Sequence, residues 1–516
     1  MLTSHSVLHE ILDRALADPS HTAVTDLDRE LSYEELIDEV ARLATGLLDH
    51  GVSEGDRVAL LIPNSVDFVV AALSSLWVGA IFVPLAITDP TSRLETIVAD
   101  CAPALVVTSD RDGSEPPPSL GDARLVLLHE LREGDRAPVP ESDAFSRVAY
   151  MIYTSGTTGT PKGVQIGNAA FAAAVRSIID ALGITRATRT LCVSPFHFDG
   201  SYANLFPTLA AGGTVVIRPR EALLFPRTFF NTVQLEKITY SGFTPSYLRL
   251  LLASPQVGNL GNSTLEMIAL GGEAISVTDL RAFWAQLPSI RVFNRYGPTE
   301  ATIAVTNVEL TPDKIDGGTV TIGRPHPGVT FVLVDDQERV IEAAHQTGEL
   351  FIGGDQLIDG YWANPELTSH VMRSDLVPGE KLYRSGDLVY RGEDGNYFYV
   401  DRTDRVVKRS GVRISLVELS ASMNRIDVVV AAACSTFDRD GELGIVAFVI
   451  SDVELSVIEM RRAASRLIPE NMLPDRIEFV ASLGLNTSNQ LDETGLLAAA
   501  GLRPYRPITA QPSIPI

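Results

Sequence analysis

One short stretch limits what this chain can fold into more than any other. Residues 148–152 form an apolar run that predicts a buried strand, and the following residues 153–163 read Y-T-S-G-T-T-G-T-P-K-G. Glycine tolerates positive φ, so successive backbone amides in such a loop can turn toward one anion, with hydroxyl groups beside them. It is not the common P-loop, because Lys162 follows a proline and Gly163 stands where Ser or Thr is needed. The stretch therefore predicts a phosphate-binding loop at a strand end, with a flexible surface loop as the alternative.

The first part of the chain alternates between strand and helix patterns. Ser32, with Glu35 three residues later, is a capping-box signal for a helix that begins at Tyr33. Residues 58–62 and 105–108 are short apolar runs typical of buried strands. Such alternation predicts an α/β fold with largely parallel sheets.

Composition argues against several classes of partner. The 65 acidic and 42 basic residues give a formal net charge of −23. This charge argues against broad binding to nucleic acids or anionic membranes, because both are polyanions that bind clusters of positive charge. Residues 68–87 carry no charge and are long enough to cross a bilayer. Gly79 interrupts them, so we expect a core helix over about 67–78 and a strand over 80–84. With no secretory signal in the N-terminal residues and three scattered cysteines, we expect a reduced cytoplasmic protein.

Further motifs follow the phosphate loop in a fixed order. Residues 294–300 read N-R-Y-G-P-T-E, residues 383–388 read Y-R-S-G-D-L, and residues 401–404 read D-R-T-D. Together these motifs resemble the signatures of the adenylate-forming superfamily, which comprises acyl-CoA synthetases, luciferases and the adenylation domains of nonribosomal peptide synthetases. The resemblance covers about residues 10–500. It implies a large N-terminal domain with several subdomains and largely parallel sheets, a hinge, and a small α+β C-terminal domain.

The resemblance implies ATP and Mg²⁺ as cofactors. Asn294 and Tyr296 would contact adenine, Asp387 would accept both ribose hydroxyls, and Glu300 would hold Mg²⁺, which prefers oxygen ligands. The implied ATP-binding residues are Thr154, Ser155, Gly156, Thr157, Thr158, Gly159, Gly272, Glu273, Asn294, Tyr296, Asp387 and Arg402. The implied catalytic residues are Lys162, Thr299, Glu300, Arg402 and Gln490.

A second set of residues is implied to bind the substrate. Residues 198–201 read F-D-G-S and match the F-D-x-S motif of amino-acid-activating members, in which the aspartate grips the substrate ammonium. Asp199 is the matching residue here, although an Asp at a helix start is also typical of an N-cap. The mapped pocket is mostly small and apolar, which favours an apolar side chain. Its members are Phe198, Asp199, Gly200, Ala203, Gly242, Ile268, Leu270, Arg295, Ile303 and Ala304.

Arg295 is the exception in that pocket. It could pair with a substrate carboxylate, and a side chain that faces the nucleotide or solvent is the equally weighted alternative.

The expected domains are residues 1–402, which bind ATP and substrate, a mobile C-terminal domain over 403–502, and a proline-rich tail over 503–516. Asp404 would be the hinge. The family normally ends in an N-G-K-x-D loop whose lysine bridges the substrate carboxylate and ATP. Here residues 486–492 read N-T-S-N-Q-L-D, so Gln490 replaces that lysine, and no lysine follows Lys408. A neutral donor gives a hydrogen bond about half as strong as a charged one.

The sequence thus predicts a free-standing ligase that adenylates an α- or β-amino acid and loads the phosphopantetheine thiol of a separate acidic carrier protein. Basic residues of the C-terminal part would meet that carrier: Arg405, Lys408, Arg409 and Arg413, or Arg461, Arg462 and Arg466. One alternative is an acyl- or aryl-CoA ligase. Another, which rests on Gln490, is a catalytically weakened protein that binds ATP or an adenylate.

Overall fold

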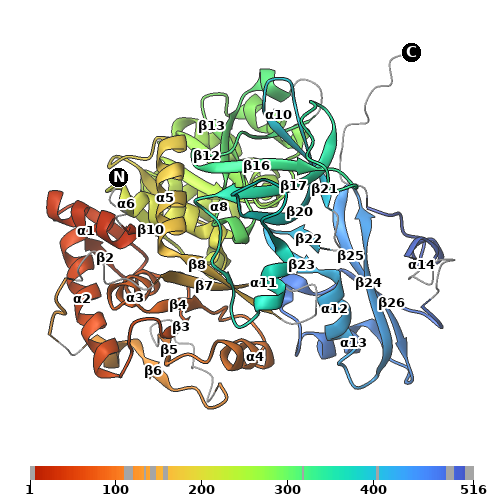
Figure 1. The fold of residues 1–516 in the computed structure, drawn as a ribbon, viewed down its shortest axis with the longest axis horizontal. Helices are drawn as coiled ribbons and strands as arrows, with labels where there is room; N and C mark the ends of the chain where they lie inside the picture. Colours follow the sequence, from red (N-terminus) through yellow and green to blue (C-terminus); the bar gives the residue numbers. More distant parts are fainter. Residues whose placement is uncertain are drawn as a thin grey trace.

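The computed structural model describes residues 6–109, 120–132, 135–139, 147–154, 161–315, 319–402, 406–483 and 493–505. Two α/β layers and an antiparallel sheet make up the larger part of the molecule, and the C-terminal segment, blue in Figure 1, lies along one side. The fold is mixed α/β with a sheet-rich C-terminal part, as predicted.

The phosphate-loop strand lies within a sheet ordered β18-β8-β7-β4-β3-β5-β6. Strands β7, β4, β3, β5 and β6 run parallel, whereas β8 and β18 are antiparallel to their neighbours. Its elements are β3 (Arg57–Leu61), α3 (Val66–Trp77), β4 (Ile81–Pro84), α4 (Thr91–Cys101), β5 (Leu105–Thr108), β6 (Leu125–Leu127), η1 (Leu128–Arg132), β7 (Val148–Thr154), β8 (Lys162–Gly167) and β18 (Gly360–Tyr361). The uncharged run is therefore the predicted buried helix and strand, α3 and β4. None of the helices in the described ranges is long and apolar enough to span a bilayer.

A second sheet is ordered β14-β13-β12-β11-β9-β10-β1-β2, and only its outermost strands β14 and β2 pair antiparallel. Its strands are β1 (Thr22–Thr25), β2 (Glu30–Ser32), β9 (Arg189–Cys192), β10 (Thr214–Ile217), β11 (Tyr240–Phe243), β12 (Met267–Gly271), β13 (Arg291–Tyr296) and β14 (Thr306–Leu310). The helices and turns that accompany it are α1 (Val7–Ala17), α2 (Tyr33–Asp49), α5 (Asn168–Leu182), η2 (Asp199–Ser201), α6 (Tyr202–Ala210), α7 (Arg220–Leu223), α8 (Pro226–Leu235), α9 (Pro245–Leu252), η3 (Val257–Asn262), α10 (Val277–Gln286), η4 (Thr299–Ala301) and η5 (Pro312–Ile315).

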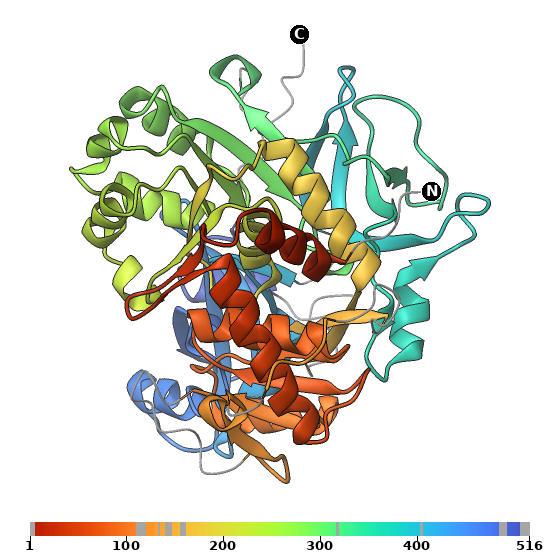
Figure 2. The same cartoon turned by 90° about the vertical axis from the view of Figure 1, so that its left-hand side faces the viewer.

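Buried aromatic side chains join the two parallel sheets. Helix α1 packs on α2, α5 and α6 on the face seen in Figure 2. Beneath them, the ring of Tyr150 lies 5.1 Å from those of Phe171 and Tyr202, and the Phe171 ring lies 4.9 Å from that of Phe206. The predicted capping box at Ser32 and Glu35 begins α2 as expected. The strand that carries the phosphate loop is thus anchored in the main core.

The third sheet is antiparallel throughout, whereas the two larger sheets are mostly parallel, as predicted. It is ordered β15-β21-β20-β17-β16, with β19 paired to β20. Its elements are β15 (Thr321–Gly323), β16 (Val329–Val334), β17 (Thr347–Gly354), α11 (Pro365–Val371), β19 (Met372–Arg373), β20 (Leu382–Arg391) and β21 (Tyr397–Arg402). Strands β20 and β21 are joined by a short hairpin, a connection that suits antiparallel neighbours.

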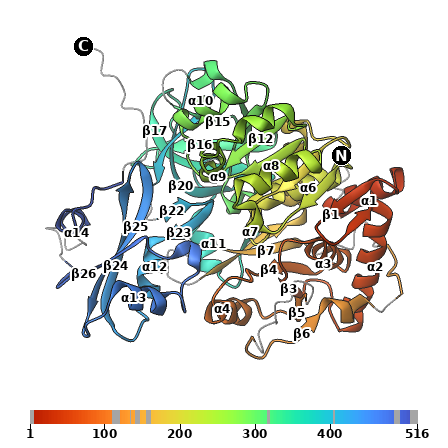
Figure 3. The same cartoon turned by 180° about the vertical axis from the view of Figure 1, so that it is seen from behind.

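The C-terminal segment has its own apolar core and a hairpin that faces the rest of the molecule (Figure 3). Its elements are β22 (Val406–Arg409), β23 (Val412–Ser415), α12 (Leu416–Met423), β24 (Val429–Arg439), β25 (Glu442–Ser451), α13 (Val457–Ala464), η6 (Glu470–Met472), β26 (Arg476–Phe479) and α14 (Glu493–Ala499). The proposed hinge residue Asp404 lies outside the described residues, and the domain boundary beside it stays a prediction.

Candidate active site

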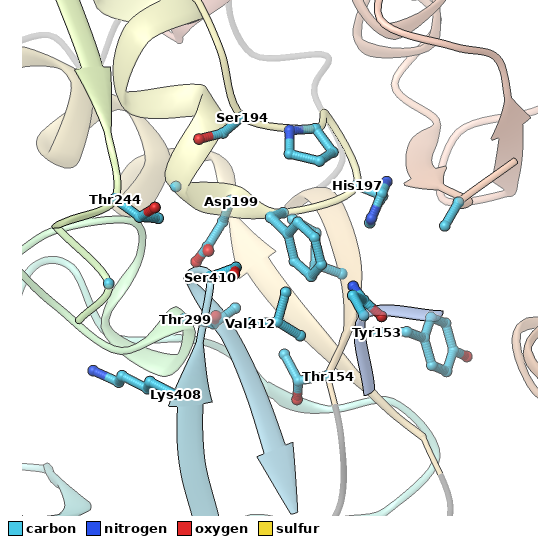
Figure 4. Close-up of a pocket in the computed structure, with 18 of the residues that line it drawn as sticks. Tyr153, Thr154, Ser194, His197, Asp199, Thr244, Thr299, Lys408, Ser410 and Val412 are labelled. Carbon is cyan, nitrogen blue, oxygen red and sulfur yellow. The ribbon is translucent and has the colours of Figure 1, made fainter. Parts of the chain in front are cut away.

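A cavity of about 170 Å³ lies where the parallel sheets, the antiparallel sheet and the β22–β23 hairpin meet. Figure 4 shows the loop that carries Ser194, His197 and Asp199 on one side, and the hairpin with Lys408, Ser410 and Val412 on another. Strand ends at the carboxyl edge of parallel sheets supply many of the lining residues, which is the usual place for ligands in α/β folds.

The predicted phosphate-binding residues are divided, because Thr154 lines the cavity whereas Lys162 and Glu300 are not among its lining residues. The Nζ atom of Lys162 lies 3.4 Å from the Tyr361 hydroxyl and 4.7 Å from the centre of that ring. The same hydroxyl donates to Oε1 of Glu300 at 2.7 Å, and Glu300 is fully buried. The Thr154 hydroxyl, at the end of β7, is buried without a hydrogen-bond partner among the described residues. Ser155, Gly156, Thr157, Thr158 and Gly159 lie outside those residues.

Tyr361 was missed by sequence reasoning. It belongs to β18, which pairs with β8 although nearly 200 residues separate them. Nothing in the local sequence signals that its hydroxyl links the phosphate-loop lysine to the acidic residue of the N-x-Y-G-P-T-E motif.

Of the predicted nucleoside-binding residues, Arg402 lines the cavity, whereas Asn294, Tyr296 and Asp387 are not among its lining residues. Asp387 is 1% exposed and accepts hydrogen bonds from the Tyr296 hydroxyl, at 2.5 Å, and from the Arg402 guanidinium. Burial, followed by the Asp387 charge, raises the pKa of Tyr296 well above its usual value, so this phenol is a donor at neutral pH. Asn294 donates to the Thr321 carbonyl at 2.7 Å. The carboxylate of Asp387 is therefore held in place by donors from two strands, β13 and β21, and its predicted contact with ribose stays a prediction.

The Gly272–Glu273 pair, also predicted to contact ATP, joins two parts of the chain. Glu273 accepts from the backbone amides of Ser246, at 2.9 Å, and of Gly411, at 3.1 Å. Gly272 has φ of +83°, and a Cβ atom there would lie 3.3 Å from the Cα of Gly411. This close approach holds the tip of the β22–β23 hairpin beside the cavity.

The predicted substrate residues divide into two groups. Those that line the cavity are Phe198, Asp199, Gly200, Gly242, Arg295 and Ile303. Those buried in the apolar cores without lining it are Ala203, Ile268, Leu270 and Ala304. Phe198 also packs on the apolar core of the C-terminal segment. The structure thus brings Asp199 into one cavity with Thr154, Thr299 and Arg402.

An ion pair that sequence reasoning missed connects α4 to α12. Arg93 contacts Oε1 of Glu418 at 2.8 Å and Asp89 at 3.3 Å, and the Glu418 side chain is 2% exposed. Burial raises the pKa of Asp89 despite the neighbouring Arg93. No local signal in the sequence identifies this pairing, because 325 residues separate Arg93 from Glu418.

The basic residues predicted to meet a carrier protein have different surroundings. Arg409 pairs with Asp475 at 3.0 Å and donates to the Leu473 carbonyl, so it is engaged within the chain. Lys408 lines the cavity. The remaining candidates are exposed on or just after α13: Arg461, Arg462 and Arg466. Arg405 and the side chain of Arg413 lie outside what the structure describes.

His197 should make stability depend on pH. Burial, with smaller contributions from Arg220 and Arg93, lowers its pKa to about 3 from an ordinary value near 6.5. The unfolded chain therefore binds a proton at pH 5 that the folded chain does not, and stability falls as pH falls from about 6.5 toward 3. The slope for one such group is about 1.4 kcal/mol per pH unit. Urea unfolding at pH 7.5 and pH 5 should show a smaller loss for His197→Asn than for the wild type, and an equal loss would contradict this.

Comparison with known proteins identifies the family of this chain. The sequence profile described as "AMP-binding enzyme" matches residues 12–362. The chain belongs to the AMP-binding enzyme family. It is 30% identical to gramicidin S synthase 2 of Brevibacillus brevis over 96% of this chain and 11% of that protein. It is 31% identical to novobiocin biosynthesis protein H of Streptomyces niveus over 98% of this chain and 86% of that protein. The predicted adenylate-forming family is thereby confirmed.

Solved structures agree on the fold of this AMP-binding enzyme. An NRPS protein containing adenylation and PCP domains, bound to a vinylsulfonamide inhibitor, superposes with a TM-score of 0.83 at 23% identity, covering 97% of this chain and 85% of that one. An o-succinylbenzoate CoA synthetase from Bacillus subtilis gives 0.82 at 22% identity, covering 94% and 98%. The chain spans about a tenth of the length of the gramicidin synthases that it matches.

Proposed function

We propose that this AMP-forming ligase adenylates an amino acid with ATP, releases pyrophosphate, and transfers the aminoacyl group to the phosphopantetheine thiol of a carrier protein. One observation carries the proposal: Asp199 lines the same cavity as Thr154, Thr299 and Arg402. A carboxylate in a partly dry pocket is well suited to hold a substrate ammonium, whereas a plain acyl group offers it no ionic contact. Family membership supports the adenylation step.

The residues that line the cavity, together with buried residues behind its walls, fit ATP. The buried Thr154 hydroxyl lacks a partner in the described chain, as expected of a group that donates to phosphate. Asn294, Tyr296 and Asp387 offer polar groups of the kind that recognise a nucleoside. Glu300 would hold Mg²⁺, which would neutralise charge on the phosphates. Its single buried carboxylate suits a metal that keeps most of its ligands from phosphate and water.

Adenylation requires placement and charge stabilisation rather than a general base. The substrate carboxylate attacks the α-phosphorus of ATP, a new C–O–P linkage forms, and the bond to pyrophosphate breaks. Arg402 and Lys408 line this cavity, and Lys162 is paired with the lining residue Thr154 across strands β7 and β8. These three cations would stabilise charge that develops on the phosphates. The carrier thiol then attacks the acyl carbon, and AMP leaves.

The acceptor is proposed on two grounds. A solved structure of similar fold contains adenylation and PCP domains, and Arg461, Arg462 and Arg466 form an exposed basic group suited to an acidic carrier. An acyl- or aryl-CoA ligase remains the second candidate, because an o-succinylbenzoate CoA synthetase shares the fold.

The experiment is ATP–pyrophosphate exchange with α-amino acids, β-amino acids and the corresponding acids without an amine. Exchange that requires the amine supports the proposal, whereas exchange only with acids that lack one favours the CoA ligase. Competition between a phosphopantetheinylated carrier protein and CoA for the adenylate then identifies the acceptor. ATP binding without exchange across the whole panel would favour the weakened binding protein.

We expect Gln490→Lys to raise the rate of exchange on the order of 10²-fold, because a preorganised charged donor contributes about that much to such a transition state. Gln490 lies outside the described residues, so this prediction rests on the motif alone. Gln286→Lys, at an exposed position of α10, adds the same charge elsewhere and should leave the rate unchanged. An unchanged rate in Gln490→Lys would show that another cation of the cavity already fulfils the role.

A further inference from the structure

Arg295 lies on the substrate side of strand β13. Successive side chains of a strand point to opposite faces, and Asn294 and Tyr296 reach Thr321 and Asp387 on the nucleoside side. Arg295, between them, instead donates from Nη2 to the Tyr240 hydroxyl at 2.5 Å and from Nε to Oδ1 of Asn307 at 3.1 Å. It is 8% exposed. The geometry therefore disfavours the two alternatives in which this side chain faces the nucleotide or solvent.

The guanidinium of Arg295 has neutral hydrogen-bond partners only. No carboxylate of the described residues forms an ion pair with it, and Nη1 has no hydrogen-bond partner there. The side chain nevertheless lines the cavity that contains Asp199. A buried charge without a counter-ion is costly, so an anion that enters the cavity beside Arg295 would be strongly favoured.

The position of Arg295 is held by a chain of packed polar groups. The Tyr240 hydroxyl donates to Oδ1 of Asn204 at 2.8 Å, and Nδ2 of Asn204 donates to the Gly242 carbonyl at 2.9 Å. A Cβ atom at Gly242 would lie 2.3 Å from Oδ1 of Asn204. Glycine at 242 thus accommodates Asn204 and does not simply enlarge an apolar pocket. The support makes Arg295 a preorganised group, which is what recognition of a specific anion requires.

We propose that the amino-acid substrate carries a second acidic group, a side-chain carboxylate, that pairs with Arg295 while its ammonium pairs with Asp199. This inference rests on the proposed function and deepens it. Two opposite charges on the walls of one cavity are complementary to an acidic amino acid, whose remaining carboxylate is the one activated by ATP. The bidentate geometry of a guanidinium suits a carboxylate and gives directional selectivity. The substrate class therefore differs from the apolar one that residue sizes alone favoured.

The test is exchange kinetics with aspartate, glutamate and 2-aminoadipate, each compared with a neutral counterpart such as asparagine, glutamine or leucine. We expect kcat/KM for one acidic substrate to exceed that of its amide at least about 10²-fold, because the amide leaves the buried cation uncompensated. Arg295→Met, which keeps length and removes charge, should lower kcat/KM for the acid by a similar factor and raise it for a neutral analogue. Arg291→Met is the matched control on the same strand, since Arg291 pairs with Glu309 outside the cavity.

The possible outcomes distinguish a failure of the Arg295 assignment from a failure of the proposed amino-acid adenylation. A wild-type preference for neutral amino acids overturns the role of Arg295 and leaves amino-acid adenylation intact. Exchange with no amino acid overturns both. The wild-type comparison depends on no variant, so it decides the matter even if Arg295→Met fails to fold. A reversal of preference in Arg295→Met supports the assignment, because loss of folded protein would lower both activities together.

Discussion

Asp199→Ala should lower kcat/KM for amino-acid-dependent ATP–pyrophosphate exchange on the order of 10²–10³-fold. The cavity places this carboxylate beside the residues proposed to bind the nucleotide. Removal of one partner of a buried, hydrogen-bonded charge pair costs about 2–5 kcal/mol, because the other charge is left desolvated and alone. In the variant the uncompensated charge is the substrate ammonium. The loss should therefore appear in both binding and the chemical step.

The amine-free analogue of the preferred substrate provides the decisive comparison. It lacks the ammonium, so its kcat/KM should be unchanged or higher in Asp199→Ala. The ratio of kcat/KM for the amino acid to kcat/KM for the analogue should therefore fall sharply in this variant. Asp180→Ala, which alters an exposed carboxylate on α5, should behave as wild type. If Asp199→Ala lowers exchange equally with both substrates, the carboxylate has a structural role, such as that of an N-cap, and the ammonium assignment is wrong.

Arg402→Ala should have the largest effect on stability, a loss of about 3–5 kcal/mol of the unfolding free energy. The guanidinium pairs with Asp387 and donates to the Ser385 carbonyl at 3.1 Å, and the side chains of Arg402 and Asp387 are 6% and 1% exposed. Such a loss is typical when one member of a buried pair is removed, because the remaining charge stays buried. Urea unfolding followed by circular dichroism measures it, and ATP affinity should fall in parallel.

Arg384→Ala is the matched control for that measurement. Arg384 lies on the same antiparallel sheet and pairs with Glu349 at 2.8 Å, but its side chain is 43% exposed. Exposed pairs contribute about 0–1 kcal/mol, since solvent screens both charges. A loss in Arg402→Ala no larger than that in Arg384→Ala would show that Asp387 finds another partner or becomes hydrated. The difference between the two variants isolates the effect of burial.

Local signals in the sequence determined much of the fold. The capping box at Ser32 and Glu35 begins α2, and Gly79 separates α3 from β4 within the uncharged run as expected. These features depend on backbone conformation and hydrophobic periodicity within a few residues, which a single sequence displays directly. The ordered motifs were sufficient for the family, because their residue types at fixed positions are far more specific than any periodicity.

The arrangement of the site depended on contacts between distant segments. Tyr361 meets Lys162 and Glu300 because β18 pairs with β8, and Arg409 turns inward because Asp475 lies across the C-terminal segment. The orientation of Arg295 follows from its place on β13 and from the Tyr240 hydroxyl on β11. Sequence order carries no direct information on such pairings, since they depend on how strands and sheets dock. The sequence alone thus identified Asp199 and Arg295 as candidate substrate-binding residues. Only the tertiary structure showed that their opposite charges line the same cavity.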